Sequence, residues 1–209
     1  SLRLHRDVPA VVIANIGTTM KGAQDDVEGI LGALDAATQR RFYLHIDAAL
    51  HGMILPFVEG APPFDFRLPV DSIAVSGHKM IGSPMPCGVV LARRANVDRI
   101  ARSVEYVGSL DTTISGSRNA LSPVFLWYAI RSLGLEGFRA RTAACLDLAA
   151  YAEEQIRGAG FVAWKNPCSN IVVFDRPSDA LVARWSLASQ RRIAHVITMP
   201  HVTRDQIDR

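Results

Sequence analysis

The stretch that decides the fold is Tyr43-Leu-His-Ile-Asp47-Ala-Ala49, which is followed further along the chain by Ser72-Ile-Ala-Val-Ser76-Gly-His78-Lys79. Each segment has the apolar character of a buried β-strand and carries polar side chains where the strand ends. Open α/β sheets bind their ligands at the carboxyl ends of their strands. The two segments therefore predict strands of one α/β sheet whose ends share a ligand site.

The polar groups at these strand ends suit pyridoxal phosphate. Lys79 can form a Schiff base with the cofactor aldehyde, and Asp47 can keep the pyridine nitrogen protonated so that the ring accepts electrons. Two alanines follow Asp47 and leave space for a flat ring. The spacing alone is not specific, because apolar strands that end in Asp or Lys are common in α/β proteins and Asp47 could form an ordinary salt bridge with an arginine.

Further motifs occur before and after these strands. They are Gly17-Thr-Thr-Met-Lys-Gly-Ala-Gln-Asp25-Asp26, His51-Gly-Met-Ile-Leu-Pro-Phe57, Pro86-Cys-Gly88 and Thr112-Thr-Ile-Ser-Gly-Ser-Arg118-Asn119. Together, the motifs resemble those of the pyridoxal-phosphate-dependent histidine decarboxylases of bacteria and the related plant serine decarboxylases, within the group II amino-acid decarboxylases. Residues 170–177 and 193–203 resemble family segments too, so the resemblance covers nearly the whole chain.

This resemblance implies a fold and an activity. The fold is α/β, of the fold-type I seen in pyridoxal-phosphate-dependent transferases, with a mostly parallel large domain and a small C-terminal α+β domain. The activity is decarboxylation of an L-amino acid, L-histidine to histamine and CO2, through a Lys79 Schiff base. Decarboxylation of L-serine to ethanolamine is the nearest alternative, and a truncated, non-catalytic remnant of such an enzyme is another.

The resemblance also assigns catalytic roles to Lys79, His78 and Asp47. In the family, the lysine holds the cofactor until the substrate amine displaces it, and the aspartate binds the pyridine nitrogen. His78 resembles a histidine near the phosphate and the substrate, and with a reference pKa of about 6.5 it could return a proton to Cα. A purely structural hydrogen bond is an equal alternative for His78. A surface role for Lys79 is disfavoured, because its Gly-, Met- and Ile-rich segment would solvate a charged amine poorly.

Three further residues are predicted to bind the cofactor. By its position in the motif, Ser76 is expected to donate a hydrogen bond to the phosphate, since a hydroxyl does so without adding charge. Ala49 is expected to pack on the face of the ring. Thr19 resembles the threonine on the phenolic-oxygen side of the ring, although a role in a turn remains open.

Other polar residues lie close to these motifs in the sequence. Alternation along the strand places His45 on the side of Asp47, where it could support that carboxylate, whereas His51 is expected to be structural. Arg118 could pair with the phosphate or the substrate carboxylate, or form a structural ion pair. Because the segment around Arg118 lies near the subunit interface in the family, we expect a homodimer with its active site close to that interface.

Composition limits the other classes of function. The chain has 209 residues, of which 49% are hydrophobic, and its net charge of +3 comes from scattered arginines. Scattered charge argues against nucleic-acid binding, and no segment has the ~20 apolar residues of a membrane span. Cys87, Cys145 and Cys168 are too widely spaced for a zinc site or a disulfide framework, so no metal is predicted. We expect a cytoplasmic enzyme whose substrate is a small molecule, an amino acid, with no nucleic-acid or membrane partner.

The pattern of apolar segments predicts a large domain over residues 1–134 and a small one over residues 135–209. In the first, strands are expected at 10–16, 43–47, 72–76 and 88–92, and helices from Asp25 or Asp26, at 95–103 and at 123–133. In the second, a helix is expected at 135–158 and another at 179–188, with strands at 161–164, 170–174 and 194–198.

The start of the chain leads us to expect a fragment. The chain begins with Ser1 rather than Met and reaches its first apolar strand within a few residues. The glycine-containing phosphate loop and the ring-stacking residue of the family, usually a histidine, would then lie in a missing N-terminal part.

Overall fold

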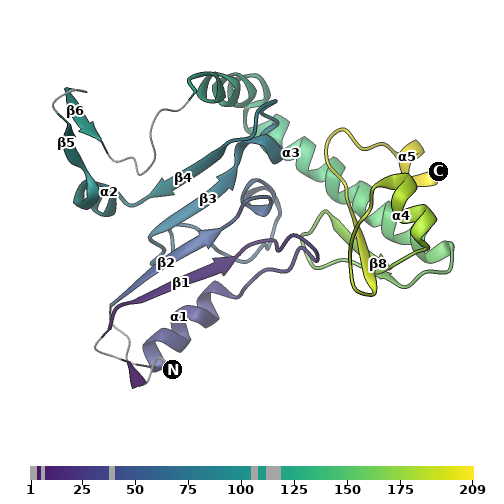
Figure 1. Ribbon diagram of the computed structural model, residues 1–209, viewed down its shortest axis with the longest axis horizontal. Helices are drawn as coiled ribbons and strands as arrows, with labels where there is room; N and C mark the ends of the chain where they lie inside the picture. Colours follow the sequence, from purple (N-terminus) through teal and green to yellow (C-terminus); the bar gives the residue numbers. More distant parts are fainter. Residues whose placement is uncertain (1–3, 6–7, 38–40, 105–107, 112–118) are drawn as a thin grey trace.

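The computed structural model describes residues 4–5, 8–37, 41–104, 108–111 and 119–209. Its larger sheet has the strand order β1 (Ala10–Asn15), β2 (Phe42–Asp47), β3 (Ser72–Ser76) and β4 (Gly88–Ala92). The first three strands are parallel, and β4 is antiparallel to β3. The predicted mostly parallel sheet is therefore confirmed, and Figure 1 shows its strands side by side from β1 to β4.

One face of this sheet is covered by α1 (Val27–Ala36), which lies beside β1 in Figure 1. Val27 packs in one core cluster with Leu44 and Ile46, which are both fully buried. The helix begins where predicted, because the Asp26 carboxylate accepts a hydrogen bond of 2.9 Å from a backbone N–H of the first turn. The apolar residues of β2 thus alternate toward this covered face.

The opposite face of the sheet is open. Val11 and Ile13 of β1 are 74% and 61% exposed, and Val90 of β4 is 66% exposed. The pairing of the strands puts all three side chains on the same face as Asp47. Exposed apolar side chains and the polar end of β2 therefore share one face.

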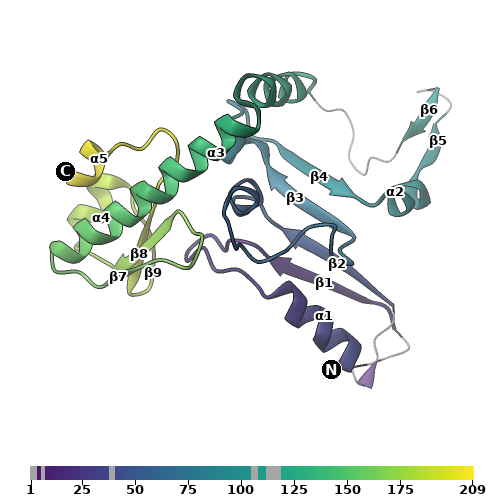
Figure 2. The same ribbon diagram turned by 180° about the vertical axis from the view of Figure 1, so that it is seen from behind.

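A long helix connects the two sheets. α3 (Leu121–Gly158) spans both helices predicted for this region, and Gly134 interrupts it with φ 56° and ψ −172°. This left-handed φ is easily adopted only by glycine, so the two predicted helices are present and meet at a kink. Figure 2 shows α3 running from the large sheet across the smaller one. Within the described ranges, no helix combines the length and apolar character that a membrane crossing requires.

The smaller sheet is antiparallel and has the strand order β7 (Ala163–Trp164), β8 (Ile171–Asp175), β10 (Ile193–Ile197) and β9 (Ala188–Gln190). Two short helices accompany it, α4 (Asp179–Trp185) and α5 (Arg204–Asp208). The predicted small α+β layer is confirmed.

Strand β8 is buried on both of its sides. Ile171 and Val173 pack in a cluster with Met80 from the large sheet region. Val172 and Phe174 pack on the other side, in a cluster that includes alanines of α3. The strand therefore lies between the helix and the larger sheet.

One predicted helix is too long. The helix expected at 95–103 is seen as α2 (Arg94–Ile100), and the chain then enters a hairpin of β5 (Arg102–Val104) and β6 (Ser109–Asp111). No residue of α2 is buried, so hydrophobic periodicity could not define where the helix ends. Arg118, beyond this hairpin, lies outside the described residues.

A second predicted helix, at 179–188, also ends early. α4 stops at Trp185 because Ser186 adopts a left-handed φ of 49°, and the unpredicted strand β9 follows. All three residues of β9 are exposed. An exposed strand of this length has no apolar alternation by which it could be recognised in the sequence.

Hydrogen bonds at two places fix the C-terminal part of the chain to the loops of the larger sheet. The Asn166 side chain donates to the Lys21 carbonyl at 2.7 Å, in the loop that follows β1. Arg141 of α3 donates from Nη1 to the carbonyls of Met80 and Ile81, at 3.0 and 3.4 Å. These contacts hold the loop after β1 and the turn after β3, which both adjoin the carboxyl ends of the parallel strands.

Candidate functional site

A cavity of about 410 Å³ lies where the two sheets meet. The large sheet contributes the ends of β1 and β2 and the turn after β3, and the small sheet contributes β8 and the end of β10. The lining residues are Asn15, Gly17, Thr18, Thr19, Asp47, Ala49, Leu50, His78, Lys79, Ile171, Ile197 and Met199.

Most of the predicted site residues meet at this cavity. Those that line it are Thr19, Asp47, Ala49, His78 and Lys79. Ser76 is not among the lining residues. It ends β3, is half-buried, and donates its backbone N–H to the Ala49 carbonyl at 3.0 Å. Its contact with a phosphate remains a prediction.

Lys79 lies in a single π-helical turn, Gly77–Ile81, directly after β3. The Lys79 side chain is half-buried and has no hydrogen bond or ion pair with any described residue. The next two carbonyls of the turn, those of Met80 and Ile81, accept the hydrogen bonds from Arg141. The turn is thus fixed from the side of α3, while the amine stays free to react.

Asp47 is the last residue of β2, and its side chain is exposed toward the open end of the sheet. Within β2, Leu44 and Ile46 point into the core instead. The Ala49 N–H donates to Oδ1 at 3.2 Å and orients the carboxylate. No cationic side chain among the described residues pairs with it.

His78 precedes the lysine and is exposed at the cavity. Its Nδ1 lies 3.2 Å from the Cys87 N–H and 3.1 Å from the Cys87 carbonyl, so the backbone of one residue fixes the ring. When the Cys87 N–H donates to Nδ1, the ring proton is on Nε2. The structural hydrogen bond and the proton-transfer role, which the sequence left as alternatives, are therefore compatible, because each uses a different nitrogen.

The two histidines that flank the aspartate motif differ in their surroundings. Nδ1 of His45 lies 2.7 Å from the Ser72 hydroxyl, and no described contact joins His45 to Asp47. His51 is fully buried, and neither of its ring nitrogens has a partner among the described residues. Burial, and then the positive charge of Lys79, lowers the pKa of His51 from 6.5 to about 4, so its ring is neutral at physiological pH.

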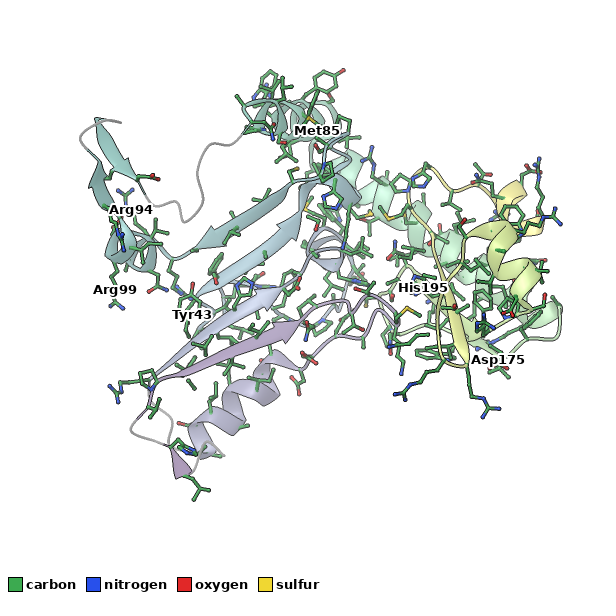
Figure 3. The ribbon with its side chains drawn as sticks, in the orientation of Figure 1. Tyr43, Met85, Arg94, Arg99, Asp175 and His195 are labelled. Atoms are coloured by element: carbon green, nitrogen blue, oxygen red, sulfur yellow. The ribbon has the colours of Figure 1, made fainter. Side chains whose placement is uncertain are left out.

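Sequence reasoning missed the contribution of the small sheet to the cavity. Ile171, Ile197 and Met199 line it, although the segments that contain them were predicted only as strands or family segments. They reach the cavity because the loop after β1 is anchored on the small sheet, where Nδ1 of His195 lies 3.2 Å from the Met20 carbonyl. Figure 3 shows His195 on the small sheet, on the side of the large one. Burial lowers the pKa of His195, and this hydrogen bond opposes the change.

A second hollow, of about 470 Å³, lies within the C-terminal region and has Trp185, His195, His201 and Arg209 on its walls. None of the predicted site residues lines it. Because its walls carry neither a lysine nor an acidic side chain, we place the candidate site in the cavity that contains Lys79.

The donor groups of that cavity fit pyridoxal phosphate. Lys79 offers a primary amine to the aldehyde, and Asp47 offers a carboxylate without a cationic partner among the described residues to the pyridine nitrogen. Ala49 presents a small apolar surface to the ring, and Thr19 presents a hydroxyl at the rim. Each of these groups matches one part of the cofactor.

The comparison with protein families decides which class of α/β protein this is. The model of the pyridoxal-dependent decarboxylase conserved domain matches residues 3–175. The chain belongs to the pyridoxal-dependent decarboxylases. The membership inferred from the sequence motifs is thus confirmed.

Relatives within the pyridoxal-dependent decarboxylases act on different amino acids. The chain is 49% identical over 196 residues to histidine decarboxylase from Vibrio campbellii, and 46% identical over 209 residues to serine decarboxylase 1 from Oryza sativa subsp. japonica. The alignments cover 92% and 99% of this chain, but 50% and 43% of the two relatives. The chain spans about half the length of these relatives.

Solved structures of decarboxylases share the fold. L-methionine decarboxylase from Streptomyces sp. 590 superposes with a TM-score of 0.87 and 29% identity, over 99% of this chain and 54% of that chain. Glutamate decarboxylase from Lactobacillus brevis superposes with a TM-score of 0.76 at 23% identity, over 94% of this chain and 52% of that chain. The predicted fold of pyridoxal-phosphate-dependent enzymes is therefore confirmed.

Proposed function

We propose that the chain carries the catalytic cavity of a pyridoxal-phosphate-dependent L-amino-acid decarboxylase, and that its substrate is L-histidine, which gives histamine and CO2. The observation that carries the proposal is the meeting of Asp47, His78 and Lys79 at one cavity, in a chain of this family. When bound, pyridoxal phosphate supplies a sink for the electron pair left on Cα after the carboxylate departs.

The aspartate and the small residues after it bind and orient the cofactor. The Asp47 carboxylate, held by the Ala49 N–H, lies where it can stabilise a protonated pyridine nitrogen. The Ala49 side chain provides a flat floor for the ring, and the Thr19 hydroxyl provides a contact at its edge. Ser76 is proposed to contact the phosphate.

Lys79 is proposed to exchange with the substrate amine, and His78 is proposed to transfer a proton. Lys79 is the residue whose amine would hold the cofactor until the substrate amine takes its place. In its protonated form, His78 donates from Nδ1 to the Cys87 carbonyl and carries a second proton on Nε2, which it can deliver to Cα after CO2 has left, so that a neutral ring remains. The proton count then balances, since the amine product carries one hydrogen on Cα in place of the lost carboxylate.

The small sheet contributes an apolar wall. Ile171, Ile197 and Met199 line the cavity from the small sheet, and Leu50 lines it from the segment after β2. An apolar wall excludes water and strengthens the interactions of Asp47 and Lys79 with charged groups, because the local dielectric constant falls.

The choice of L-histidine rests on the motifs and on relatives such as the Vibrio campbellii enzyme. L-serine is a second candidate, because the serine decarboxylase of Oryza sativa aligns with 99% of this chain. L-histidine and L-serine differ only in their side chains, so both would use the same chemistry at Cα.

Pyridoxal phosphate binding is the first test. The 209-residue chain and its Lys79→Ala variant are titrated with pyridoxal phosphate, and the visible absorbance band of lysine-bound cofactor is recorded. Lys165→Ala is the matched control, because it removes another lysine that does not line the cavity. We expect the band in the wild type and in the control, and its loss in Lys79→Ala. A band that survives in Lys79→Ala, or none in the wild type, would overturn the assignment of the site.

Product analysis then identifies the substrate. The loaded protein is incubated separately with L-histidine, L-serine and L-methionine, and released CO2 and amine are quantified. Histamine is the expected product, and ethanolamine would instead establish the serine alternative. Cofactor binding without any amine product would support the non-catalytic remnant.

Three further expectations concern the domain boundary, the oligomeric state and the cellular location. We propose that residues 1–134 and 135–209 are separate domains with their boundary at Gly134, that the protein is a homodimer, and that it acts in the cytoplasm. The homodimer is supported by exposed Trp127 and Tyr128 on the first part of α3, which are 63% and 66% exposed. Sedimentation of the wild type and of a Trp127→Ser/Tyr128→Ser variant tests the homodimer, and cell fractionation tests the location.

A further inference from the structure

His51 is a buried side chain that the proposed mechanism does not use. It begins the short helical turn His51–Met53, four residues after Asp47, and is fully buried. Neither Nδ1 nor Nε2 has a hydrogen-bond partner among the described residues. A buried polar group without a hydrogen-bond partner destabilises the fold, so an imidazole in this position calls for a partner.

The imidazole lies directly behind the wall of the cavity. Its edge is packed against the backbone of Gly17, where a Cβ atom would overlap the ring, and Gly17 has a left-handed φ of 97°. Gly17 itself lines the cavity, as does Leu50, the residue before His51. The absence of a side chain at Gly17 therefore makes room for the ring next to the site.

Lys79 is a complementary group that lines the same cavity as Gly17. Its amine has no partner among the described residues, and its charge lowers the pKa of His51, after burial itself. An ammonium group has three donors and no acceptor, whereas a neutral imidazole has one lone pair that can accept. The two unpaired groups therefore satisfy each other if the lysine side chain turns toward His51.

We propose that His51 is the resting partner of Lys79: the lone pair of its neutral ring accepts a hydrogen bond from the lysine ammonium whenever the amine is not joined to the cofactor. His51 is thus a positioning residue, which keeps the amine next to the cavity after the substrate has displaced it. Its importance for turnover rests on the proposed function of Lys79, but the pairing of the two side chains does not.

Nitrogen NMR of the cofactor-free chain tests the pairing directly. The resonance of the unprotonated ring nitrogen of His51 moves when that nitrogen accepts a hydrogen bond. The wild type is compared with Lys79→Met, which keeps the length of the side chain but has no donor, and with Lys21→Met as the control. We expect Lys79→Met to shift the His51 resonance and Lys21→Met to leave it in place. An unchanged resonance in Lys79→Met would overturn the proposal, whether or not the chain binds pyridoxal phosphate.

A pair of variants at His51 tests the consequence for the lysine. His51→Gln keeps an acceptor, whereas His51→Leu fills the same space without one. A hydrogen bond to the ammonium form favours it, so without that bond in His51→Leu the lysine should react with pyridoxal phosphate at a lower pH. The measurement is the pH midpoint of the rate at which the visible band of lysine-bound pyridoxal phosphate forms. We expect a lower midpoint in His51→Leu and a midpoint near that of the wild type in His51→Gln.

Thermal unfolding of the same variants separates pairing from simple filling of the core. If His51 only fills space, leucine removes an unpaired polar group, so the melting temperature should rise without a change in the midpoint, and the proposal is then wrong. Should His51→Leu fail to fold, the NMR comparison decides, because it leaves His51 in place. A wild type that never forms the band refutes the proposed function, and the NMR result still stands for or against the pairing.

Discussion

The parallel sheet and the antiparallel sheet of this molecule differ in how they are covered. On β1 of the parallel sheet, Ile13 is 61% exposed on the open face. On β8 of the antiparallel sheet, Ile171 is 1% exposed, and the strand is buried on both sides. Parallel sheets are usually covered on both faces, whereas antiparallel sheets often leave one face to solvent. In this molecule the parallel sheet leaves one face exposed, whereas β8 of the antiparallel sheet is covered on both sides.

The difference shows which part of the molecule supports the candidate site. The covered face of the parallel sheet and the antiparallel sheet each have a core, and a third cluster joins Leu50 and Met80 of the first region with Ile171 of the second. The open face adds no buried contact along β1. The cavity is therefore held mainly by the junction between the two sheets, and its stability should depend on that junction more than on the exposed strand face.

The largest expected effect on the free energy of unfolding comes from truncating a buried isoleucine of the antiparallel sheet, compared with an exposed one of the parallel sheet. Ile171→Ala and Ile13→Ala remove the same atoms from strands of the two sheets. Ile171→Ala should reduce the free energy of unfolding by about 2–5 kcal/mol, because it leaves a cavity in a packed core. Ile13→Ala should change it by no more than about 0.5 kcal/mol, as is typical of exposed positions. Urea unfolding measures both. Similar losses would mean that the open face is covered in solution, for instance by a second copy of the chain.

The next largest effect is the pH dependence of the free energy of unfolding that His51 causes. Unfolded His51 takes up a proton as the pH falls below 6.5, whereas folded His51 resists protonation until about pH 4. The contribution of the neutral ring is therefore complete above pH 6.5 and is lost as the pH falls toward 4, by up to about 3 kcal/mol. Urea unfolding at a series of pH values measures this loss. The His51→Gln variant has no titrating ring, so a loss as steep as that of the wild type would contradict the assignment.

Arg141 should have a smaller effect, on the contact between α3 and the lysine turn. Arg141→Met removes the hydrogen bonds to Met80 and Ile81 and should cost about 1–3 kcal/mol. Amide hydrogen exchange in the turn after β3 should accelerate. Arg139→Met is the control, because Glu136 is the only partner of Arg139 among the described residues, at 3.4 Å on the exposed side of α3. If amide exchange in the turn after β3 is equally fast in both variants, the stability of this turn does not depend on its contact with α3.

Asn166 should have the smallest effect. Asn166→Ala removes the hydrogen bond to the Lys21 carbonyl and should cost about 0.5–1.5 kcal/mol. Faster exchange is expected in the loop after β1, while the exchange of β8 stays unchanged. Exchange that accelerates equally in both places would show that the two regions open as one unit rather than at their junction.

Much of the fold could be predicted from the sequence, because buried strands and helices have periodic apolar residues. Leu44 and Ile46 identified β2, Asp26 identified the start of α1, and Gly134 identified the break in α3. The β5–β6 hairpin and β9 were both missed. All three residues of β9 are exposed, and an exposed short strand has no such periodicity.

The candidate site was predictable where its residues follow strands in one sheet. Asp47 and Lys79 were found because each comes directly after a strand of the parallel sheet. The exposure of Asp47 was not foreseen, because it depends on which face of the sheet is covered. The wall formed by Ile197 and Met199 was not foreseen either, because it depends on how two distant segments pack, which no local pattern specifies.

The anchoring of the loop after β1 also determines when the cavity can form. The hydrogen bonds from Asn166 and His195 to this loop join residues 145 and 175 positions apart in the chain. Contacts between such distant residues form slowly, because a long stretch of chain must first be closed into a loop. During synthesis, Asp47 and Lys79 leave the ribosome well before residue 195 does. The cavity is therefore assembled last, and a nascent chain that has already formed its parallel sheet is not yet able to enclose a cofactor.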